Sequence, residues 1–392
     1  MSSNELFTPL AIANGRIELS HRVVLAPMTR NRGVALSDSV DNRTWLADDL
    51  VARYYSQRAS PGGLLITEGI PPSLEASGMP NVPGLFHESQ YEGWKKVVQG
   101  VHAKGGYIYA QLWHAGRATI PQMTGHPVVS ASSVPWSTDE TFPFRTPDTK
   151  EKIRYRDFPS VAMTEDQIAK TTQDFVKAAE AAISIGFDGV EINGGNGNHS
   201  YGGSPQARGK FALDLVAAVT SAVGPSNVAI RLEPTGLYNE TFGAERVETW
   251  SHLCSQLAST YQGDNKLSYV HFIEPRLDRV EANNELFNSS WTLPEVSNEH
   301  FRDILKKSGI PSISCGGWDA TNVVGSVLEK KWDAVAFAKL FVSNPDLPER
   351  LQLGKSLNEY DRSRFYGSWD GVREHGYVDY PTWGEGEQKK TE

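Results

Sequence analysis

Short apolar runs and longer amphipathic stretches alternate along the chain. Eight of the short runs are rich in Val, Ile and Leu and show little alternation of apolar and polar positions, which is typical of parallel strands buried on both faces. These expected strands span residues 22–29, 63–70, 107–114, 189–192, 228–234, 269–275, 312–317 and 334–339. The pattern predicts a largely parallel sheet.

Helical periodicity fills the intervals between the expected strands. The clearest helix, 164–186, begins with Thr164 and Gln167 in capping-box spacing and ends at Gly186. The other expected helices span residues 50–60, 88–104, 205–223, 246–261, 298–307 and 321–331. Eight strands, nearly all followed by a helix, predict an α/β fold of the (β/α)8 TIM-barrel type.

The barrel prediction treats residues 1–392 as a single domain with inserted loops. An open, doubly wound sheet is the alternative; closure is favoured because the repeats are regular and no Gly-x-Gly-x-x-Gly follows the first strand. Residues 117–161 contain many Pro, Ser and Thr, which predicts a long inserted lid or binding loop. Residues 384–392 form a polar tail that we expect to fray.

Composition narrows the class of protein. The chain has 392 residues, 39% hydrophobic and 22% charged, with a net charge of −9 and no dense Lys/Arg cluster, which argues against a nucleic-acid partner. Cys254 and Cys315 are the two cysteines, far apart and in apolar contexts, so neither a disulfide framework nor a metal site is expected. With no visible signal peptide or membrane-spanning run, a cytoplasmic enzyme is expected, as a monomer or a homodimer.

The fourth expected strand ends in an unusual polar sequence. In a TIM barrel the site lies at the carboxyl ends of the strands. Here the strand runs into Asn193-Gly194-Gly195-Asn196-Gly197. The two amides would reach the mouth of the barrel, and the glycines let a flat ligand approach the backbone. Asn193 and Asn196 are therefore candidate ligand-binding residues.

The first three strands end in further candidates. Thr29, after Pro27 and Met28, can hold a carbonyl or ring nitrogen of a ligand, or can simply cap a turn. Gly69 either lets a ligand approach the backbone closely or marks the beginning of a loop. A buried Gln111 needs a partner, which either a flat heterocycle or the protein backbone can supply.

The later strands carry the candidate anion site. Arg231 lies inside an apolar strand. Burying its charge there costs free energy unless the guanidinium is paired, either with Glu191 or with an anionic ligand. Gly316-Gly317-Trp318 ends the seventh strand and Ala338-Lys339 the eighth. Consecutive glycines beside a cation, at these two strands, indicate a phosphate site of the kind common in TIM barrels.

These motifs together resemble the Old Yellow Enzyme family of flavin-dependent ene-reductases, most of all its fungal members. The matching segments, which cover nearly the whole chain, are Pro27-Met28-Thr29-Arg30, Ile66-Thr67-Glu68-Gly69, Gln111-Leu112-Trp113, Val190-Glu191-Ile192, Tyr201-Gly202-Gly203-Ser204, Ser343-Asn344-Pro345-Asp346-Leu347, Tyr360-Asp361-Arg362 and Gly376-Tyr377-Val378-Asp379-Tyr380-Pro381. The resemblance implies non-covalent FMN and transfer of hydride from NADPH, through flavin N5, to the C=C of an α,β-unsaturated carbonyl compound.

The resemblance also assigns roles to residues. It implies FMN contacts from Pro27, Met28, Thr29, Gly69, Gln111, Arg231, Gly317, Trp318, Ala338 and Lys339. It implies that Asn193 and Asn196 hold the carbonyl oxygen of the substrate, that Thr29 also acts in catalysis, and that Trp113 and Tyr366 lie on the substrate side. Lys339 stands where the family usually has Arg, and it lacks the bidentate fork of Arg.

The chain departs from the family at two places. Asn193 replaces the usual His, and only Asn198-His199-Ser200 separate Gly197 from Tyr201, where the family has a longer segment with a proton-donating Tyr. The segment is deleted naturally, removed by engineering, or left out of a continuously numbered sequence; the intact flanking motifs favour the last. The departures leave two alternatives to a reductase: a redox-neutral isomerase or cyclase on the same FMN scaffold, and a flavin-binding protein without turnover.

Overall fold

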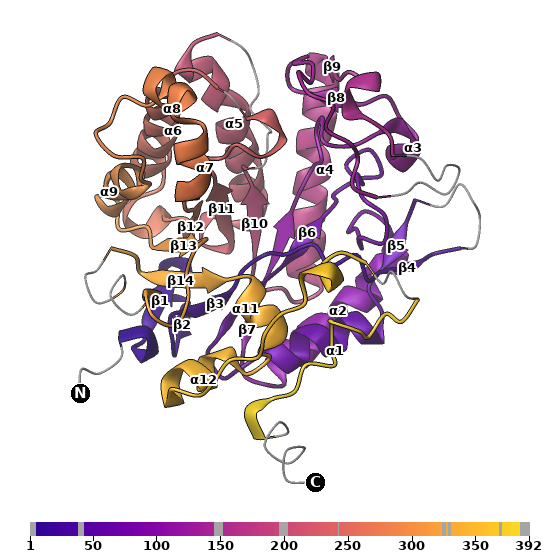
Figure 1. Ribbon diagram of the computed structural model, residues 1–392, viewed down its shortest axis with the longest axis vertical. Helices are drawn as coiled ribbons and strands as arrows, with labels where there is room; N and C mark the ends of the chain where they lie inside the picture. The colour runs from indigo at the N-terminus through magenta and orange to yellow at the C-terminus, as the bar shows by residue number, and fades with distance from the viewer. Residues whose placement is uncertain are drawn as a thin grey trace.

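Eight parallel strands close into a barrel at the centre of the molecule (Figure 1). The computed structural model describes residues 5–37, 43–144, 152–195, 203–241, 243–323, 327, 331–367 and 371–384. The barrel strands are β3 (Val23–Leu25), β6 (Leu64–Ile70), β7 (Tyr107–Leu112), β10 (Gly189–Asn193), β11 (Val228–Leu232), β12 (Val270–Ile273), β13 (Ser312–Cys315) and β14 (Ala334–Phe337). Each strand pairs with the next in the chain, and β14 pairs with β3. The prediction of a TIM barrel is confirmed.

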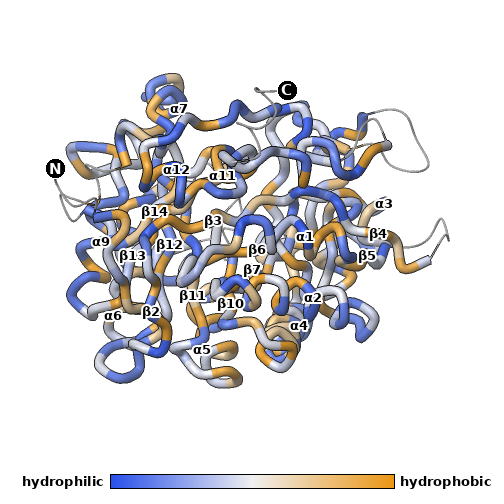
Figure 2. Tube along the Cα trace, turned by 90° about the horizontal axis from the view of Figure 1, so that it is seen from below, coloured by the Kyte–Doolittle hydropathy of each residue, from blue (hydrophilic) through white to orange (hydrophobic). Residues whose placement is uncertain are grey.

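Helices cover the outside of the barrel. They are α1 (Asp49–Arg58), α2 (Glu88–His102), α4 (Glu165–Ser184), α5 (Pro205–Val223), α6 (Arg246–Thr260), α9 (Glu299–Lys306), α11 (Lys339–Ser343) and α12 (Leu347–Leu353). The expected capping box of α4 is present, since Thr164 Oγ1 accepts from Gln167 N and Gln167 Oε1 accepts from Thr164 N. Much of the expected helix 321–331 lies outside the described residues. Figure 2 shows the apolar residues concentrated along the strands. None of the described helices is long and apolar enough to span a membrane.

The first strand is shorter than its apolar run suggests. It ends at Leu25, although the expected strand continues to residue 29. Ala26 N still donates to Phe337 O, but Pro27 has no N–H with which to extend the ladder. The chain therefore leaves the barrel at Pro27, and Met28 and Thr29 lie at its mouth.

Smaller elements close the two ends of the barrel. A hairpin of β1 (Leu10–Ile12) and β2 (Ile17–Leu19) packs against the interior residues Tyr109 and Tyr269. The insertion after β7 contains α3 (Pro121–Thr124), β8 (Val129–Ser130) and β9 (Val161–Ala162), with its own apolar cluster around Trp136, Phe142 and Tyr155. Other short strands and α-helices are β4 (Val34–Ala35), β5 (Trp45–Leu46), α7 (Leu277–Ala282) and α8 (Asn284–Ser290). Most of the expected polar tail, residues 385–392, lies outside the described residues.

Buried arginines tie the C-terminal segment to the barrel. Arg30 donates to the carbonyl oxygens of Phe365 and Gly376, at 2.9 Å and 2.7 Å. Its guanidinium carbon lies 5.2 Å from the ring centroid of Tyr54 and 5.1 Å from that of Tyr377. Such carbonyl and aromatic partners compensate a buried guanidinium for lost water. The segment that contains Tyr366 is thereby held across the mouth of the barrel.

Candidate active site

A cavity of about 670 Å³ opens at the carboxyl ends of the barrel strands. It gathers most of the residues that the sequence nominated: Pro27, Met28, Thr29, Gly69, Gln111, Trp113, Asn193, Arg231, Ala338 and Tyr366. Asn196, the second amide of the expected pair, lies outside the described residues. The nominated residues come from six of the eight strand ends, and Ile273 at the end of β12 adds a seventh that faces the same space.

A smaller pocket of about 250 Å³ adjoins this cavity. Gly317, Trp318 and Lys339 line it, and Thr29 and Tyr366 line both spaces. Gly317 has a φ of +73°, which a side-chain-bearing residue rarely adopts. The candidate phosphate residues thus lie together, next to the larger cavity.

Gly69 allows β6 and β7 to meet closely at the cavity wall. The pairing of these strands shifts register between Ile66 and Gly69. A Cβ atom at Gly69 would lie 3.0 Å from Trp113 Cβ, tighter than ordinary contact. A side chain at position 69 would therefore displace Trp113 from its place in the wall by a few tenths of an ångström.

Five polar side chains form a network inside the barrel, just beneath the cavity. They come from neighbouring strands and are Gln111, Glu191, Arg231, His271 and Cys315. The buried carboxylate of Glu191 accepts from Gln111 Nε2 at 2.6 Å and lies 3.0 Å from His271 Nδ1. Arg231 donates to Cys315 Sγ at 3.1 Å. We call this set the interior polar network.

The network corrects two expectations. Glu191 hydrogen-bonds Gln111 and His271, and the hydrogen bond of Arg231 goes to Cys315; the direct Arg231–Glu191 pair considered from sequence is not the arrangement found. Cys315 was expected in an apolar context, but it lies beside a guanidinium. The sequence could not reveal these partners because they stand on strands 80 to 84 residues apart in the chain.

Charges in the network compensate one another. Burial opposes the ionisation of Glu191, but His271 and Arg231 outweigh it and lower the pKa of the carboxyl. Burial also disfavours the Arg231 cation, yet Cys315 and Glu191 raise its pKa. Arg231 therefore carries a firm positive charge on the floor of the cavity. Within the described part of the chain its Nε has no hydrogen-bond partner, so a donor remains for an electron-rich ligand.

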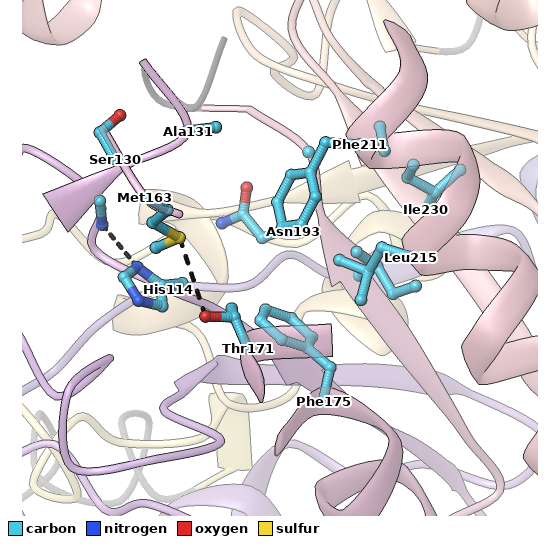
Figure 3. A pocket seen from close by; sticks show the side chains of 14 residues that line it. His114, Ser130, Ala131, Met163, Thr171, Phe175, Asn193, Phe211, Leu215 and Ile230 are labelled. Carbon is cyan, nitrogen blue, oxygen red and sulfur yellow. Dashed lines mark hydrogen bonds between the residues drawn. The ribbon is translucent and has the colours of Figure 1, made fainter. Parts of the chain in front are cut away.

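Asn193 stands at the end of β10 with its amide oriented by two contacts. Its Nδ2 donates to Gln111 Oε1 at 3.3 Å, and its Oδ1 accepts from Gly195 N at 3.0 Å. Asn193 also lines a second, apolar cavity of about 70 Å³, together with Phe175 and Phe211 (Figure 3). The second hydrogen of Nδ2 is left for a ligand in the main cavity.

Three tyrosines line the main cavity: Tyr155, Tyr238 and Tyr366. Tyr155 belongs to the insertion and stacks on Trp136, with ring centroids 4.4 Å apart. Burial raises the pKa of the Tyr155 hydroxyl, so Tyr155 holds its proton at neutral pH. Sequence reasoning found Tyr366 alone, because Tyr155 and Tyr238 lie in irregular segments without a strand-end signal.

Comparison with known proteins identifies the family. A model of the NADH:flavin oxidoreductase / NADH oxidase family matches residues 5–358. The flavin oxidoreductase hxnT of the fungus Emericella nidulans is 41% identical, over 96% of this chain and 97% of its own. The 12-oxophytodienoate reductase 1 of Oryza sativa subsp. japonica is 36% identical, over 96% and 92% of the two chains.

Solved structures agree with these relatives. Morphinone reductase in complex with tetrahydroNAD superposes with a TM-score of 0.79 and 34% identity, covering 97% of this chain and 98% of that one. The Old Yellow Enzyme homologue from Zymomonas mobilis gives a TM-score of 0.79 and 26% identity, over 96% and 99%. This chain belongs to the Old Yellow Enzyme family. It is an NAD(P)H-dependent flavin oxidoreductase whose cofactor is FMN.

The residues of the site fit this cofactor. Arg231 offers a cation and an unshared donor on the cavity floor, beside the amide of Gln111. An electron-rich pyrimidine edge matches such donors, and a fixed cation favours the anionic reduced form of a flavin. The adjoining pocket offers Lys339 and the open backbone of Gly317 to a phosphate.

Proposed function

We propose that this enzyme reduces the C=C bond of α,β-unsaturated carbonyl compounds with NADPH as reductant. When bound, FMN would supply the two-electron chemistry that carries a hydride from NADPH to the β-carbon of the enone. The observation that carries the proposal is the meeting of the cation Arg231, the hydroxyl of Thr29 and the amide of Asn193 in one cavity.

The strand ends would hold the cofactor. Gln111 and Arg231 would bind the pyrimidine edge of the isoalloxazine ring, with Pro27, Met28, Thr29 and Gly69 along its wall. Gly317, Trp318, Ala338 and Lys339 would surround the phosphate. Lys339 provides charge without the planar fork of Arg, so its contribution is a point charge.

Asn193 would hold the substrate by its carbonyl oxygen. Its Nδ2 donates one hydrogen to Gln111 Oε1, and the other can reach an acceptor in the cavity. This donor would stabilise the negative charge that develops on the oxygen as the β-carbon is reduced. Because an amide does not titrate, this activation should be weaker than that by a cationic His and independent of pH near neutrality.

Reduction also requires a proton at the α-carbon. The connection between Gly197 and Tyr201, where the family has its proton-donating Tyr, lies outside the described residues. Tyr155, Tyr238 and Tyr366 line the cavity instead. We propose that one of these hydroxyls, or water admitted to the cavity, supplies the proton. Trp113 and Tyr366 would form the walls on the substrate side.

The redox-neutral alternative has no support from the relatives. The matched proteins are named as a flavin oxidoreductase, 12-oxophytodienoate reductases and morphinone reductase. A reductase therefore remains the function that the site and the family favour.

Isotope transfer tests the proposal. NADPH deuterated at the transferable position of its nicotinamide is incubated with cyclohexenone and the purified enzyme without oxygen. We expect saturated ketone with deuterium on the β-carbon, and about tenfold or greater loss of rate in Asn193→Ala. Unlabelled or isomerised product would refute the proposed reaction. So would a rate of NADPH oxidation that does not change when the enone is added.

A further inference from the structure

Cys315 occupies a position that no other described cysteine shares. Its side chain is 4% exposed, at the end of β13, and its Sγ lies 3.1 Å from the Arg231 guanidinium. Arg231 in turn lines the cavity in which we place the flavin. Cys254, by contrast, is fully buried in the apolar core on α6. The thiol of Cys315 therefore touches the cation that the flavin would meet.

The surroundings of Cys315 favour its ionised form. Arg231 on β11 is in contact, and His271 faces it from β12, with Glu191 on β10 behind the imidazole. Glu274, at the carboxyl side of β12, also interacts with the charge of the thiolate, and burial raises the pKa of its own carboxyl to about 7. Burial alone would raise the pKa of the thiol, yet Arg231 and His271 together lower it to about 7. Both thiol and thiolate are then present near neutral pH.

We propose that Cys315 is a positioning residue whose thiolate pairs with Arg231 and thereby lowers the reduction potential of bound FMN. The inference rests on the proposed placement of the flavin beside Arg231. When the thiol loses its proton, the new negative charge offsets part of the guanidinium charge. The reduced flavin, which is anionic at N1, is then stabilised less, so the equilibrium between the two forms shifts toward the oxidised flavin. When the thiol is protonated, Arg231 acts with its full charge.

The same coupling acts in reverse. If the thiolate disfavours reduced flavin, reduced flavin must disfavour the thiolate to the same extent. The thiol of Cys315 should therefore titrate at higher pH in the reduced enzyme than in the oxidised enzyme. A contact that served only to pack the interior would show no such dependence.

Potentiometry on the holoenzyme tests the proposal. The midpoint potential of bound FMN is measured across the pH range in which the thiol titrates, for wild type, Cys315→Ser and the control Cys254→Ser. We expect wild type and Cys315→Ser to agree at low pH and to diverge as pH rises, with wild type lower. A change of about tenfold in relative affinity for reduced FMN corresponds to about 30 mV. Cys254→Ser should follow wild type.

A second measurement needs no variant that might lose FMN. The thiolate absorbance of wild type is followed against pH in the oxidised and the dithionite-reduced enzyme, and we expect reduction to raise the titration midpoint by about one pH unit. Equal midpoints, or a difference between wild type and Cys315→Ser that is constant at every pH, would overturn the proposal. If Arg231→Met changes the potential and Cys315→Ser does not, only the role of Cys315 fails. If neither changes it, the placement of the flavin beside Arg231 fails as well.

Discussion

Asn193 is the residue from which the substrate's carbonyl oxygen would receive its hydrogen bond. We predict that Asn193→Ala weakens the binding of phenolic ligands by about 1–3 kcal/mol, because a phenolate loses a buried donor. Asn193→His should strengthen binding, since a protonatable imidazole stabilises a phenolate better than a neutral amide. Titration of the charge-transfer absorbance measures both. Asn227→Ala, at the opposite end of the barrel, is the control, and unchanged affinity in both Asn193 variants would make this amide structural.

Arg231 supplies the positive charge on the cavity floor. We predict that Arg231→Met weakens retention of FMN or lowers its reduction potential, because the anionic reduced flavin loses its counter-charge. The dissociation constant of FMN and its midpoint potential measure the effect. Arg302→Met removes a buried arginine from the outer helix α9 and should leave the potential unchanged. Equal potential and occupancy in Arg231→Met would leave only a structural role for Arg231.

Strand-end reasoning found the residues of the site better than it found their partners. Thr29, Gln111, Asn193 and Arg231 were nominated because polar groups at the ends of apolar strands must face the mouth of a barrel. That reasoning gives no register between strands. The hydrogen bonds of Gln111 to Glu191 and of Arg231 to Cys315 depend on this register and on side-chain packing. A His within the apolar strand around residue 271 was a further signal of the network, beside the buried Gln111 and Arg231.

At the scale of elements, the end of β6 and the C-terminal segment meet in a buried cluster. Glu68 Oε2 accepts from Arg30 N at 3.2 Å, and Arg30 holds the carbonyl oxygens of that segment. Burial raises the pKa of the Glu68 carboxyl from 4.5 to about 7, against opposing contacts from Arg30. The cluster that holds Tyr366 over the cavity therefore contains a carboxyl that titrates near neutral pH.

Glu68 should make stability depend on pH in a defined direction. Its pKa is higher in the folded than in the unfolded chain, so the folded chain binds the proton more tightly. Its contribution to the free energy of unfolding is present below about pH 4.5 and declines as pH rises to about 7. We predict that the stability of Glu68→Gln relative to wild type increases over this range, measured by denaturant unfolding. The exposed Glu180→Gln is the control; parallel profiles for wild type and Glu68→Gln would contradict the prediction.

The order and type of the barrel elements could be predicted because each has a strong local signal. Continuous apolar runs gave the strands, and capping residues gave the start of α4. The ends of strands were less certain, since an apolar run such as 22–29 continues past the last ladder hydrogen bond into the loop after Pro27. The short elements of the insertion were not predicted, because β8 and β9 are two residues each and depend on contact with one another.

At the scale of the whole molecule, the cavity is a product of chain segments far apart in sequence. Strand ends provide its floor, the insertion provides Phe144 and Tyr155, and the C-terminal segment provides Tyr366. In the proposed arrangement the barrel would fix the cofactor side, and the other two segments would shape the substrate side. This division is consistent with one chemistry on a shared scaffold and a substrate preference set by loops.

The flavin half-reaction with an enone tests the central claim most directly. The purified protein should be yellow and release FMN on denaturation; without oxygen, NADPH should bleach its flavin absorbance. Addition of cyclohexenone should then restore the oxidised spectrum and yield one saturated ketone for each flavin reoxidised. The account would be contradicted if the flavin stayed reduced after addition of cyclohexenone and other enones. A colourless protein that takes up no added FMN would contradict it as well.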